Sequence, residues 1–343
     1  MERQRKYSRR TALWAGVSAA AAAGGLAGGR WYAEQQAHGD GTFEAADRSQ
    51  ILAPTALHQT TVPQSFAFDD SRGDIYAVQL AQGGLRLPGE PYRLSSAERE
   101  KRGDLCVTRL SAGGRPSGHM FLRGFGHGVS LGVEPSASGA LLWTESQADP
   151  ATGYGRAVTR FPFRDGAVLD SDHPGLRHHR PVPGSLANQP SVDMAARRVM
   201  VSYWTVPAYG RRQQWYAVYA MADFLAGRYE PLHTVPQRGR GAAETFQGCV
   251  LYGDRVYQLA GNPYTRASGA NPAVSGGNTR VTAIGLSGGP VPAPRRITVA
   301  ADLAYREPEG LAVRLAGGPR LCVGFATGSS RARMLAIHSC GRA

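Results

Sequence analysis

The most regular feature of the sequence is a strand-like pattern that recurs about every 60 residues. In each copy a polar side chain is followed by small and apolar residues and then by a turn, and the copies lie at 64–68, 127–131, 189–192, 247–251 and 309–313. Short apolar runs between turn residues are typical of β-strands. A fixed period of this length indicates a repeat architecture.

Two further strand-like runs follow each copy in the same order. The second runs are 75–78, 141–144, 199–202, 256–259 and 321–324, and the third runs are 105–108, 157–160, 216–219, 281–284 and 334–337. Glycines such as Gly73, Gly139 and Gly253 lie between the first and second runs, as is typical of short hairpins. Some units have a fourth run, at 118–122 and 296–299, and helical patterns are confined to 95–101 and 222–227.

Five units of this kind predict an all-β fold, a five-bladed β-propeller that spans residues 43–343. The last unit ends at Ala343 without room for a fourth strand, so we expect residues 51–60 to supply it and to close the ring. Small residues at 65, 128, 248 and 310 fit a crowded axis, and Pro190 is tolerated at the first position of a strand. A pair of β-sandwiches is the alternative fold, but it does not explain the fivefold spacing.

The first 33 residues have the layout of an export signal. A basic start is followed by an uncharged apolar run at 12–27, and Arg9 and Arg10 within 8–13 resemble a twin-arginine consensus. Residues 34–42 are then a linker. The alternative is an uncleaved membrane anchor, because the apolar run nearly spans a bilayer. In both cases we expect a secreted protein, or one associated with the cell wall or membrane, whose body lies outside the cytoplasm.

The composition supports the predicted fold, and the net charge limits the kinds of partner. The 44 glycines and 22 prolines among 343 residues favour many short elements joined by turns. The net charge is +13, almost all of it from arginine, because Lys6 and Lys101 are the only lysines. A cationic surface concentrates anionic polymers, and export argues against nucleic acid. Acidic lipid and anionic wall glycopolymer remain, with the membrane contacted only through an uncleaved N-terminus, and we expect a monomer.

The four cysteines do not have the spacing of a metal site. Cys106, Cys249, Cys322 and Cys340 are either buried apolar side chains or include one disulfide, which export permits and which most plausibly involves Cys322 and Cys340. No cofactor is expected from the sequence, and a calcium ion stays an open alternative.

The starts of the five first strands meet near one mouth of a propeller axis. We expect a ring of polar side chains there, formed by Gln64, His127, Gln189, Gln247 and Glu309. Loops between second and third strands reach the same face and offer wall residues, namely Glu145, Tyr154, Arg156, Tyr203, Trp204, Tyr209, Asn262, Tyr264 and Arg266. Aromatic faces, amides and arginines suit a sugar that carries phosphate or carboxylate. The alternative is a structural role, in which the polar residues satisfy one another and channel water.

A catalytic role has weaker support. Glu145 and Glu309, with His127, are candidates for general acid and base hydrolysis of a glycosidic or phosphodiester bond. The Gly-rich stretches at 24–25 and 276–277 lack the lysine of a phosphate loop. We therefore favour a binding module, and keep a hydrolase or lyase as the alternative.

Several strings at these same positions resemble the family of teichoic-acid-operon protein C. They are Pro63 to Asp69, Gly103-Asp104-Leu105, Gly124-Phe125-Gly126-His127-Gly128-Val129, Leu142-Trp143-Thr144-Glu145, Gly153-Tyr154-Gly155-Arg156 and Glu307-Pro308-Glu309-Gly310-Leu311-Ala312. The same propeller is shared with receptor-binding tail proteins of phages that attack Gram-positive cells. The resemblance implies a five-bladed propeller that recognises wall glycopolymer such as teichoic acid, and it supplies no catalytic residues. This chain differs in its export signal and arginine-rich surface, so its ligand can be another anionic wall polymer.

Overall fold

The computed structural model describes residue 43 and residues 48–205, 212–265, 271, 273–289 and 291–342. The predicted export signal (1–33) and linker (34–42) lie outside these residues. No helix among the described residues is both long enough and apolar enough to cross a membrane.

The first two sheets follow one another along the chain. The first contains β2 (Pro63–Asp69), β3 (Asp74–Leu80), β4 (Leu105–Leu110) and β5 (Pro116–Arg123), with β9 (Val168–Asp170) added parallel to β5. The helix α3 (Ser96–Arg102) precedes β4, and Ser95 and Glu98 form its capping box. The second sheet contains β6 (Gly132–Ser136), β7 (Gly139–Ala148), β8 (Gly155–Pro162) and β10 (His178–His179).

The other three sheets have the same antiparallel order. The third contains β11 (Leu186–Asp193), β12 (Arg198–Thr205), β13 (Gln213–Ala220) and β14 (His233–Pro236), with the helix α4 (Met221–Ala226) after β13. The fourth contains β15 (Thr245–Tyr252), β16 (Arg255–Gly261), β18 (Arg280–Gly285) and β19 (Arg295–Arg296), with a short 3-10 helix (Ala273–Ser275) before β18. The fifth contains β20 (Tyr305–Arg314), β21 (Arg320–Ser329), β22 (Ala332–Arg342), β1 (Gln50–Ala56) and β17 (Tyr264–Thr265).

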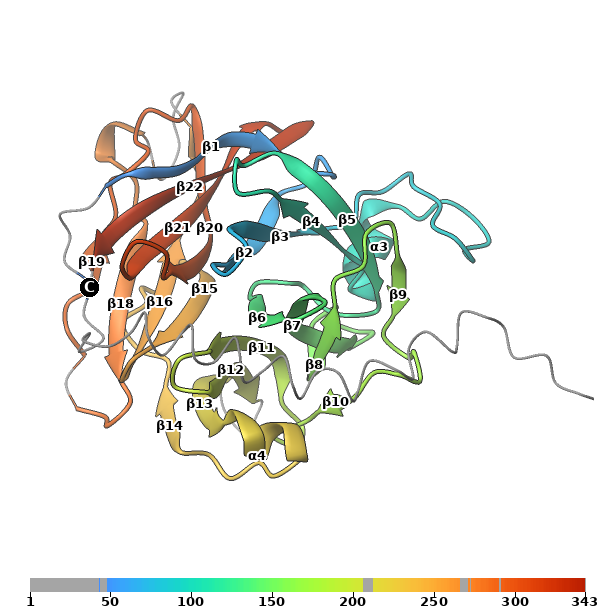
Figure 1. Cartoon of the computed structure of the whole chain (residues 1–343). Helices are drawn as coiled ribbons and strands as arrows, with labels where there is room; N and C mark the ends of the chain where they lie inside the picture. The colour runs from blue at the N-terminus through green and yellow to red at the C-terminus, as the bar shows by residue number, and fades with distance from the viewer. Residues whose placement is uncertain are drawn as a thin grey trace, which may run out of the picture.

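The five sheets surround a common centre like the blades of a propeller (Figure 1). The first strand of each blade lies innermost and contacts the innermost strands of both neighbours, and these strands are β2, β6, β11, β15 and β20. In the fifth blade the outermost strand is β1, which pairs antiparallel with β22. The predicted five-bladed β-propeller is thus confirmed.

The predicted second and third runs all lie within strands, but some first and fourth runs do not. Residues 127–131 precede β6, which begins only at Gly132. Residues 296–299 extend past β19, which ends at Arg296. Pro190 lies inside β11 rather than at its first position, and is tolerated because β11 pairs with β12 alone and has a free edge.

The innermost strands crowd one another at the axis. Gly310 has a φ of +86°, and a Cβ there would lie 2.9 Å from the Cα of Ser65. Hydrogen bonds also join successive blades, because Ser65 Oγ donates to the carbonyl of Gly128 (2.6 Å) and Ser130 Oγ donates to that of Pro190 (2.6 Å). Backbone atoms and small side chains of neighbouring blades therefore pack closely around the axis.

Apolar side chains fill the spaces between blades. The largest cluster extends through the second, third, fourth and fifth blades and includes Trp143, Phe224 and Phe325. All four cysteines are free and buried, and burial raises the pKa of the Cys249 thiol to about 12. The expectation that the cysteines are buried apolar side chains is confirmed, and none of the four forms the disulfide that was the alternative.

We expect Gly310→Ala to destabilise the propeller more than Gly166→Ala. Both glycines have positive φ, but no heavy atom lies within 4 Å of a Cβ built at Gly166. Each variant should lose about 1 kcal/mol from the backbone conformation, and Gly310→Ala should lose about 1–3 kcal/mol more from overpacking. Urea denaturation of both variants measures the difference, and equal midpoints would contradict the crowded axis.

Candidate functional site

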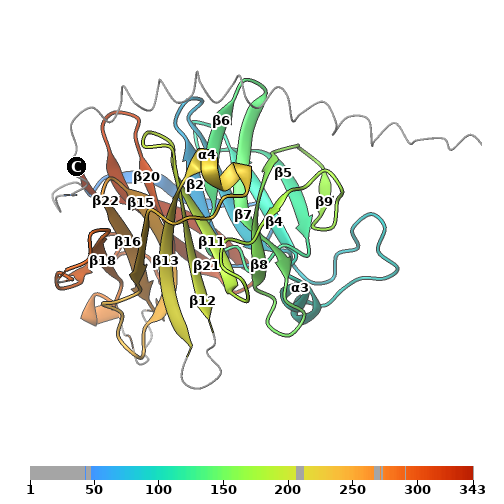
Figure 2. The ribbon, with the colours of Figure 1, turned by 90° about the horizontal axis from the view of Figure 1, so that it is seen from below.

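The innermost strands all begin on one face of the propeller, here called the start face, which is the lower side in Figure 2. Because neighbouring strands are antiparallel, the connections from second to third strands return to this face. The helix α3 lies on the start face and α4 on the opposite face (Figure 2). Residues that are far apart in the sequence therefore meet on the start face.

Three rings and one guanidinium form a continuous row on the start face, here called the aromatic row. His127 stacks on Tyr154 with their ring centroids 5.0 Å apart. Tyr154 meets Trp204 in an edge arrangement at 5.2 Å. The guanidinium of Arg212 lies over the Trp204 ring, 3.5 Å from its centroid. The row thus offers flat apolar surfaces that end in a positive charge.

The carboxylate of Glu145, on β7, fixes one end of the aromatic row. It is fully buried and accepts hydrogen bonds from the backbone N–H groups of His127 (2.8 Å), Gly128 (2.7 Å) and Gly155 (2.6 Å). A Cβ at Gly126 would lie 2.2 Å from the Glu145 side chain, and a Cβ at Gly155 would lie 2.6 Å from it. Only glycine fits at these two positions, so the sequence around Glu145 sets the backbone on both sides of the His127–Tyr154 stack.

Burial changes the ionisation of this end of the row. It raises the pKa of Glu145 to about 7, against the opposing effect of the three N–H donors. Burial also lowers the pKa of His127 below its ordinary value. The imidazole is therefore neutral at pH 7, and the stack with Tyr154 carries no charge.

A cavity of 320 Å³ lies beside the aromatic row, here called the Trp204 pocket. The second, third and fourth blades line it with apolar side chains such as Tyr203 and Phe246 and with the amides of Gln189, Gln214 and Gln237. Among the described residues, the indole Nε1 of Trp204 and the amide oxygen of Gln237 are buried without a hydrogen-bond partner. A buried donor and acceptor without partners are uncommon in folded proteins.

Two arginines give the Trp204 pocket its positive charge. Arg212 and Arg240 both line it, and neither forms an ion pair with a described residue. Arg240 instead donates to the carbonyl of Glu244 (2.5 Å) and to the amide oxygen of Gln214 (3.2 Å). The carboxylate of Glu244 is engaged by Arg280 at 3.4 Å. Burial lowers the pKa of Arg212. Tyr154 raises this pKa, and the positive charge of Arg240 lowers it further.

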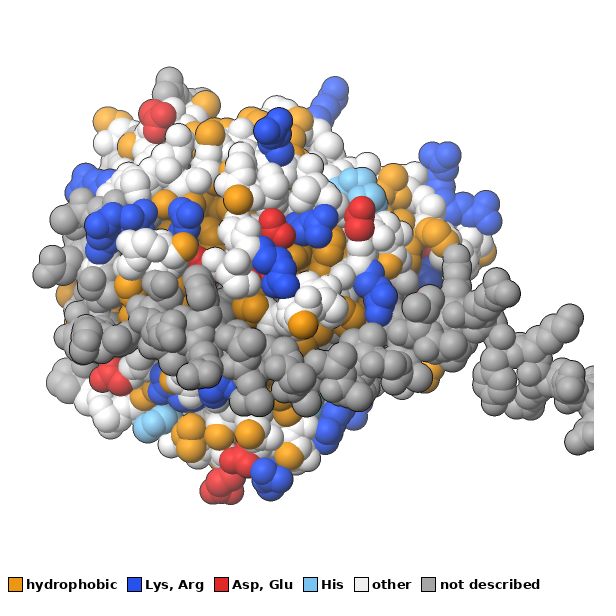
Figure 3. Space-filling model, viewed as in Figure 1, with side chains coloured by type: hydrophobic (Ala, Val, Ile, Leu, Met, Phe, Trp, Pro, Cys, Tyr) orange, Lys and Arg blue, Asp and Glu red, His pale blue; other side chains and the backbone are white. Residues whose placement is uncertain are grey.

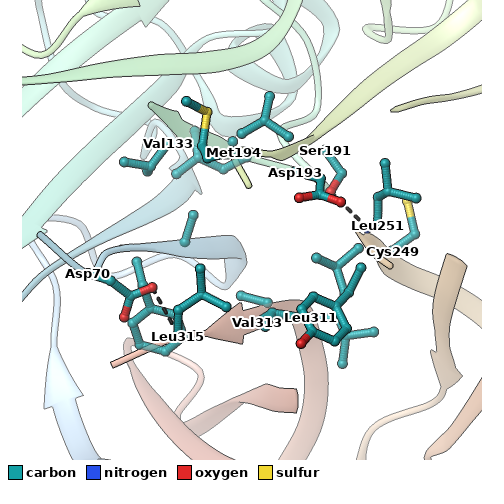
Figure 4. Close-up of a pocket in the computed structure, with 18 residues that line it drawn as sticks. Asp70, Val133, Ser191, Asp193, Met194, Cys249, Leu251, Leu311, Val313 and Leu315 are labelled. Carbon is teal, nitrogen blue, oxygen red and sulfur yellow. Dashed lines mark hydrogen bonds between the residues drawn. The ribbon is translucent and has the colours of Figure 1, made fainter. Parts of the chain in front are cut away.

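The axis itself does not offer a comparable space. Its channel has a volume of 60 Å³ and is lined mainly by apolar residues of all five innermost strands, including Val133, Leu251 and Leu311 (Figure 4). Asp70 stands near it, where its carboxylate accepts hydrogen bonds from the backbone of Leu315 and Ala316. Such a volume holds a few water molecules, so a sugar fits beside the axis rather than in it.

A family model for the phage five-bladed β-propeller receptor-binding platform domain matches residues 62–339. The chain belongs to this family. The match starts one residue before β2 and ends within β22, so it includes all five innermost strands of the propeller.

A sequence relative and a solved structure agree with the family. The relative, from Bacillus subtilis (strain 168), carries the provisional name major teichoic acid biosynthesis protein C and is 25% identical over 299 residues, which is 84% of this chain and 62% of the relative. The tail fiber of Staphylococcus aureus phage P68 has a TM-score of 0.61 at 15% identity, over 86% of this chain and 53% of the fiber. This chain thus spans less than two thirds of either relative.

A glycoside hydrolase structure, the GH43_1 enzyme from Xanthomonas citri, is a more distant likeness. Its TM-score is 0.44 at 13% identity, over 84% of this chain and 91% of that enzyme. A likeness at this level has no bearing on the activity of this chain.

The propeller brings together some of the predicted site residues. Gln189, Tyr154, Tyr203 and Trp204 line one pocket, and His127 joins them through the aromatic row. Arg212, Gln214, Gln237 and Arg240 were not predicted from the sequence. Arg212 and Gln214 lie four and two residues before the predicted third run at 216–219.

The other predicted residues are not part of the pocket lining. Gln64 and Gln247 donate weakly to the carbonyls of Val62 and Gly261, both at 3.4 Å. Glu309 is buried, and burial with the charge of Glu307 raises its pKa well above the ordinary value.

Five predicted wall residues remain. Arg156 pairs with Asp149, and Asn262 bonds to the backbone of Thr245 (3.0 Å) and Ala243 (2.8 Å). Tyr264 is buried, with Arg306 near its ring, while Tyr209 and Arg266 lie outside the described residues. In the part of the chain that the structure describes, no three His, Cys, Asp or Glu side chains gather as metal ligands.

We expect Glu145→Gln to destabilise the fold at pH 8, where Glu145 is ionised. The amide of glutamine keeps one acceptor oxygen but turns an N–H₂ donor toward the Gly155 or His127 side, so a buried N–H loses its partner. The free energy of unfolding should fall by about 1–3 kcal/mol. Chemical denaturation measures it, with Glu230→Gln, an exposed glutamate, as the control. Equal losses in both variants would contradict the positioning role of Glu145.

Proposed function

We propose that the protein is exported and binds an anionic cell-wall glycopolymer of the teichoic-acid type in the Trp204 pocket. The observation that carries the proposal is the pair Arg212 and Arg240, which line a pocket beside stacked aromatic rings and have no ion-pair partner among the described residues. A phosphodiester group pairs well with guanidinium groups. The pair therefore suits the phosphate of such a polymer.

The neighbouring side chains suit the rest of a repeat unit. Tyr154 and Trp204 offer ring surfaces for the apolar face of a sugar or polyol. Gln189, Gln214 and Gln237 offer amides for its hydroxyl groups. The volume of 320 Å³ lies within the usual range of small-ligand sites, so one repeat unit would occupy the pocket.

The relatives and the charge support the same ligand class. The family is named for receptor binding by phages, and the Bacillus subtilis relative is named for teichoic acid biosynthesis. The net charge of +13 favours a polyanion. On the opposite face the visible arginines and lysines are spread over several blades without forming one patch (Figure 3), so the surface charge by itself does not define a site there.

The proposal includes the twin-arginine export signal at residues 1–33 and a place in or on a Gram-positive type cell wall. It also takes the pairing of β1 with β22 as the closure of the ring, and the working protein as a monomer. Closure leaves the fifth blade without an exposed outer strand at β22, which suits a protein that acts alone outside the cell.

Binding is favoured over hydrolysis because of the contacts of Glu145. Both oxygens of this carboxylate are taken up by three backbone N–H groups, and the side chain is fully buried. A general acid must reach the leaving oxygen of its substrate. Glu145 therefore acts in this proposal by positioning the aromatic row, and Glu309 and His127 are assigned no proton transfer.

We expect Arg212→Gln to weaken binding of a glycosylated poly(glycerol phosphate) probe at least about tenfold, since a hydrogen bond to a charged group contributes about 1.5–3 kcal/mol. Trp204→Ala should have a similar effect through the lost ring surface. Titration calorimetry of the full chain at physiological salt measures both. Arg228→Gln is the control, because Arg228 is exposed near α4 and pairs only with Asp223 among the described residues.

Two further measurements make this experiment decisive. Hyaluronate, a carboxylate polysaccharide, replaces the phosphate probe in a parallel titration, and weaker binding of hyaluronate is expected because the two arginines would face one carboxylate per disaccharide. Mass spectrometry follows the release of small fragments from the phosphate probe. No binding of either polymer, equal binding by Arg212→Gln, or fragments released by the wild-type protein would overturn the proposal.

A further inference from the structure

We propose that a groove at the rim of the start face is a second subsite for the same polymer, and this proposal rests on the proposed function. The groove, here called the rim groove, has a volume of 510 Å³. Its polar lining comes from the ends of α3, β5, β7 and β9 and from the segment after β9, and consists of Lys101, Arg102, Arg123, Gln147, Asp170, Ser171 and Asp172.

The rim groove and the Trp204 pocket lie on two sides of one turn. This turn, at 149–154, joins β7 to β8 and is closed by hydrogen bonds between the backbones of Asp149 and Tyr154 (2.8 Å) and of Gly153 and Asp149 (2.7 Å). Pro150 lines the rim groove, while Tyr154 lines the Trp204 pocket. A polymer that leaves the pocket over this turn enters the groove.

The turn is held firmly against α3, so its position is defined. A Cβ at Gly153 would lie only 2.4 Å from the carbonyl oxygen of Glu100. Asp149 also receives hydrogen bonds from the backbone of Ala151 (3.0 Å) and Thr152 (2.9 Å) at one carboxylate oxygen. The distance between the two subsites is therefore fixed by the fold.

The charges of the groove favour an anionic group. Arg123 and Asp170 neutralise each other through two hydrogen bonds of 2.5 and 2.6 Å. Lys101 is exposed and forms no ion pair among the described residues, and Arg102 lies 3.9 Å from Asp104. Asp104 is also bound by the buried Arg99 at 2.8 Å, and Arg99 pairs with Glu90 as well, so Asp104 offsets part of the charge of Arg102. The lining as a whole has three cations against two carboxylates, Asp170 and Asp172.

The backbone of the groove is strained where it faces this space. Gln147 has a φ of +59°, a conformation that residues other than glycine seldom adopt. Its N–H donates to Ser171 Oγ at 2.9 Å, and its amide oxygen accepts a hydrogen bond from Arg180. These two hydrogen bonds stabilise the strained backbone of Gln147 and place the positive charge of Arg180 beside the groove. Retained strain of this kind is concentrated at functional sites.

Two subsites on a rigid scaffold predict that affinity rises with the length of the ligand. The probes are a single glycerol-phosphate unit and poly(glycerol phosphate) oligomers of increasing length, titrated against the full chain. For wild-type protein the longer oligomers should bind roughly tenfold or more tightly than the single unit. The double variant Lys101→Gln with Arg102→Gln should lose this gain while its affinity for the single unit is unchanged.

The control removes the same charge on the opposite face. Arg115, in the turn between β4 and β5, and Arg228, after α4, are exposed there, and Arg115→Gln with Arg228→Gln should keep the length dependence. If the Lys101 and Arg102 variant kept it too, or lost affinity equally for the single unit, the second subsite would be overturned while the pocket stood. If wild-type protein bound no probe of any length, the proposed function and the second subsite would both be overturned.

Discussion

The buried carboxylate of Glu145 is the interaction on which the start face depends. Residues 127–131 do not form a strand, so they have no strand ladder. The Glu145 carboxylate instead accepts hydrogen bonds from the backbone N–H groups of His127 and Gly128. Its other oxygen binds Gly155, at the beginning of the next strand. One side chain thus sets two backbone segments of the second blade, and through Tyr154 it sets the neighbouring Trp204.

Crowding at the axis explains why the pocket lies between blades. Gly310 approaches the backbone of Ser65 so closely that no side chain fits between them, and the remaining channel has a volume of only 60 Å³. Only farther from the axis do the blades diverge enough to leave space for a ligand. The same close packing that joins the five blades therefore moves the polar pocket away from the centre.

The sequence predicts the fold well because each blade repeats one pattern of apolar strands and hairpin turns. It predicts Tyr154 and Trp204 for the same reason, since loops after second strands reach one face. Gln64, Gln247 and Glu309 do not line the Trp204 pocket, because which of five equivalent positions borders a space depends on side-chain packing between blades. Arg212 and Arg240 were missed because they come from different blades and no spacing in the sequence relates them.

The two pocket arginines have an energetic consequence of their own. Like charges that are partly removed from water repel one another, and this repulsion weakens as solvent screening increases. The lowered pKa of Arg212 reflects burial together with the charge of Arg240. In the proposed complex an anionic ligand beside both arginines would relieve this repulsion as well as add attraction. A neutral sugar of the same shape would gain neither, so charge would contribute to the proposed selectivity as well as shape.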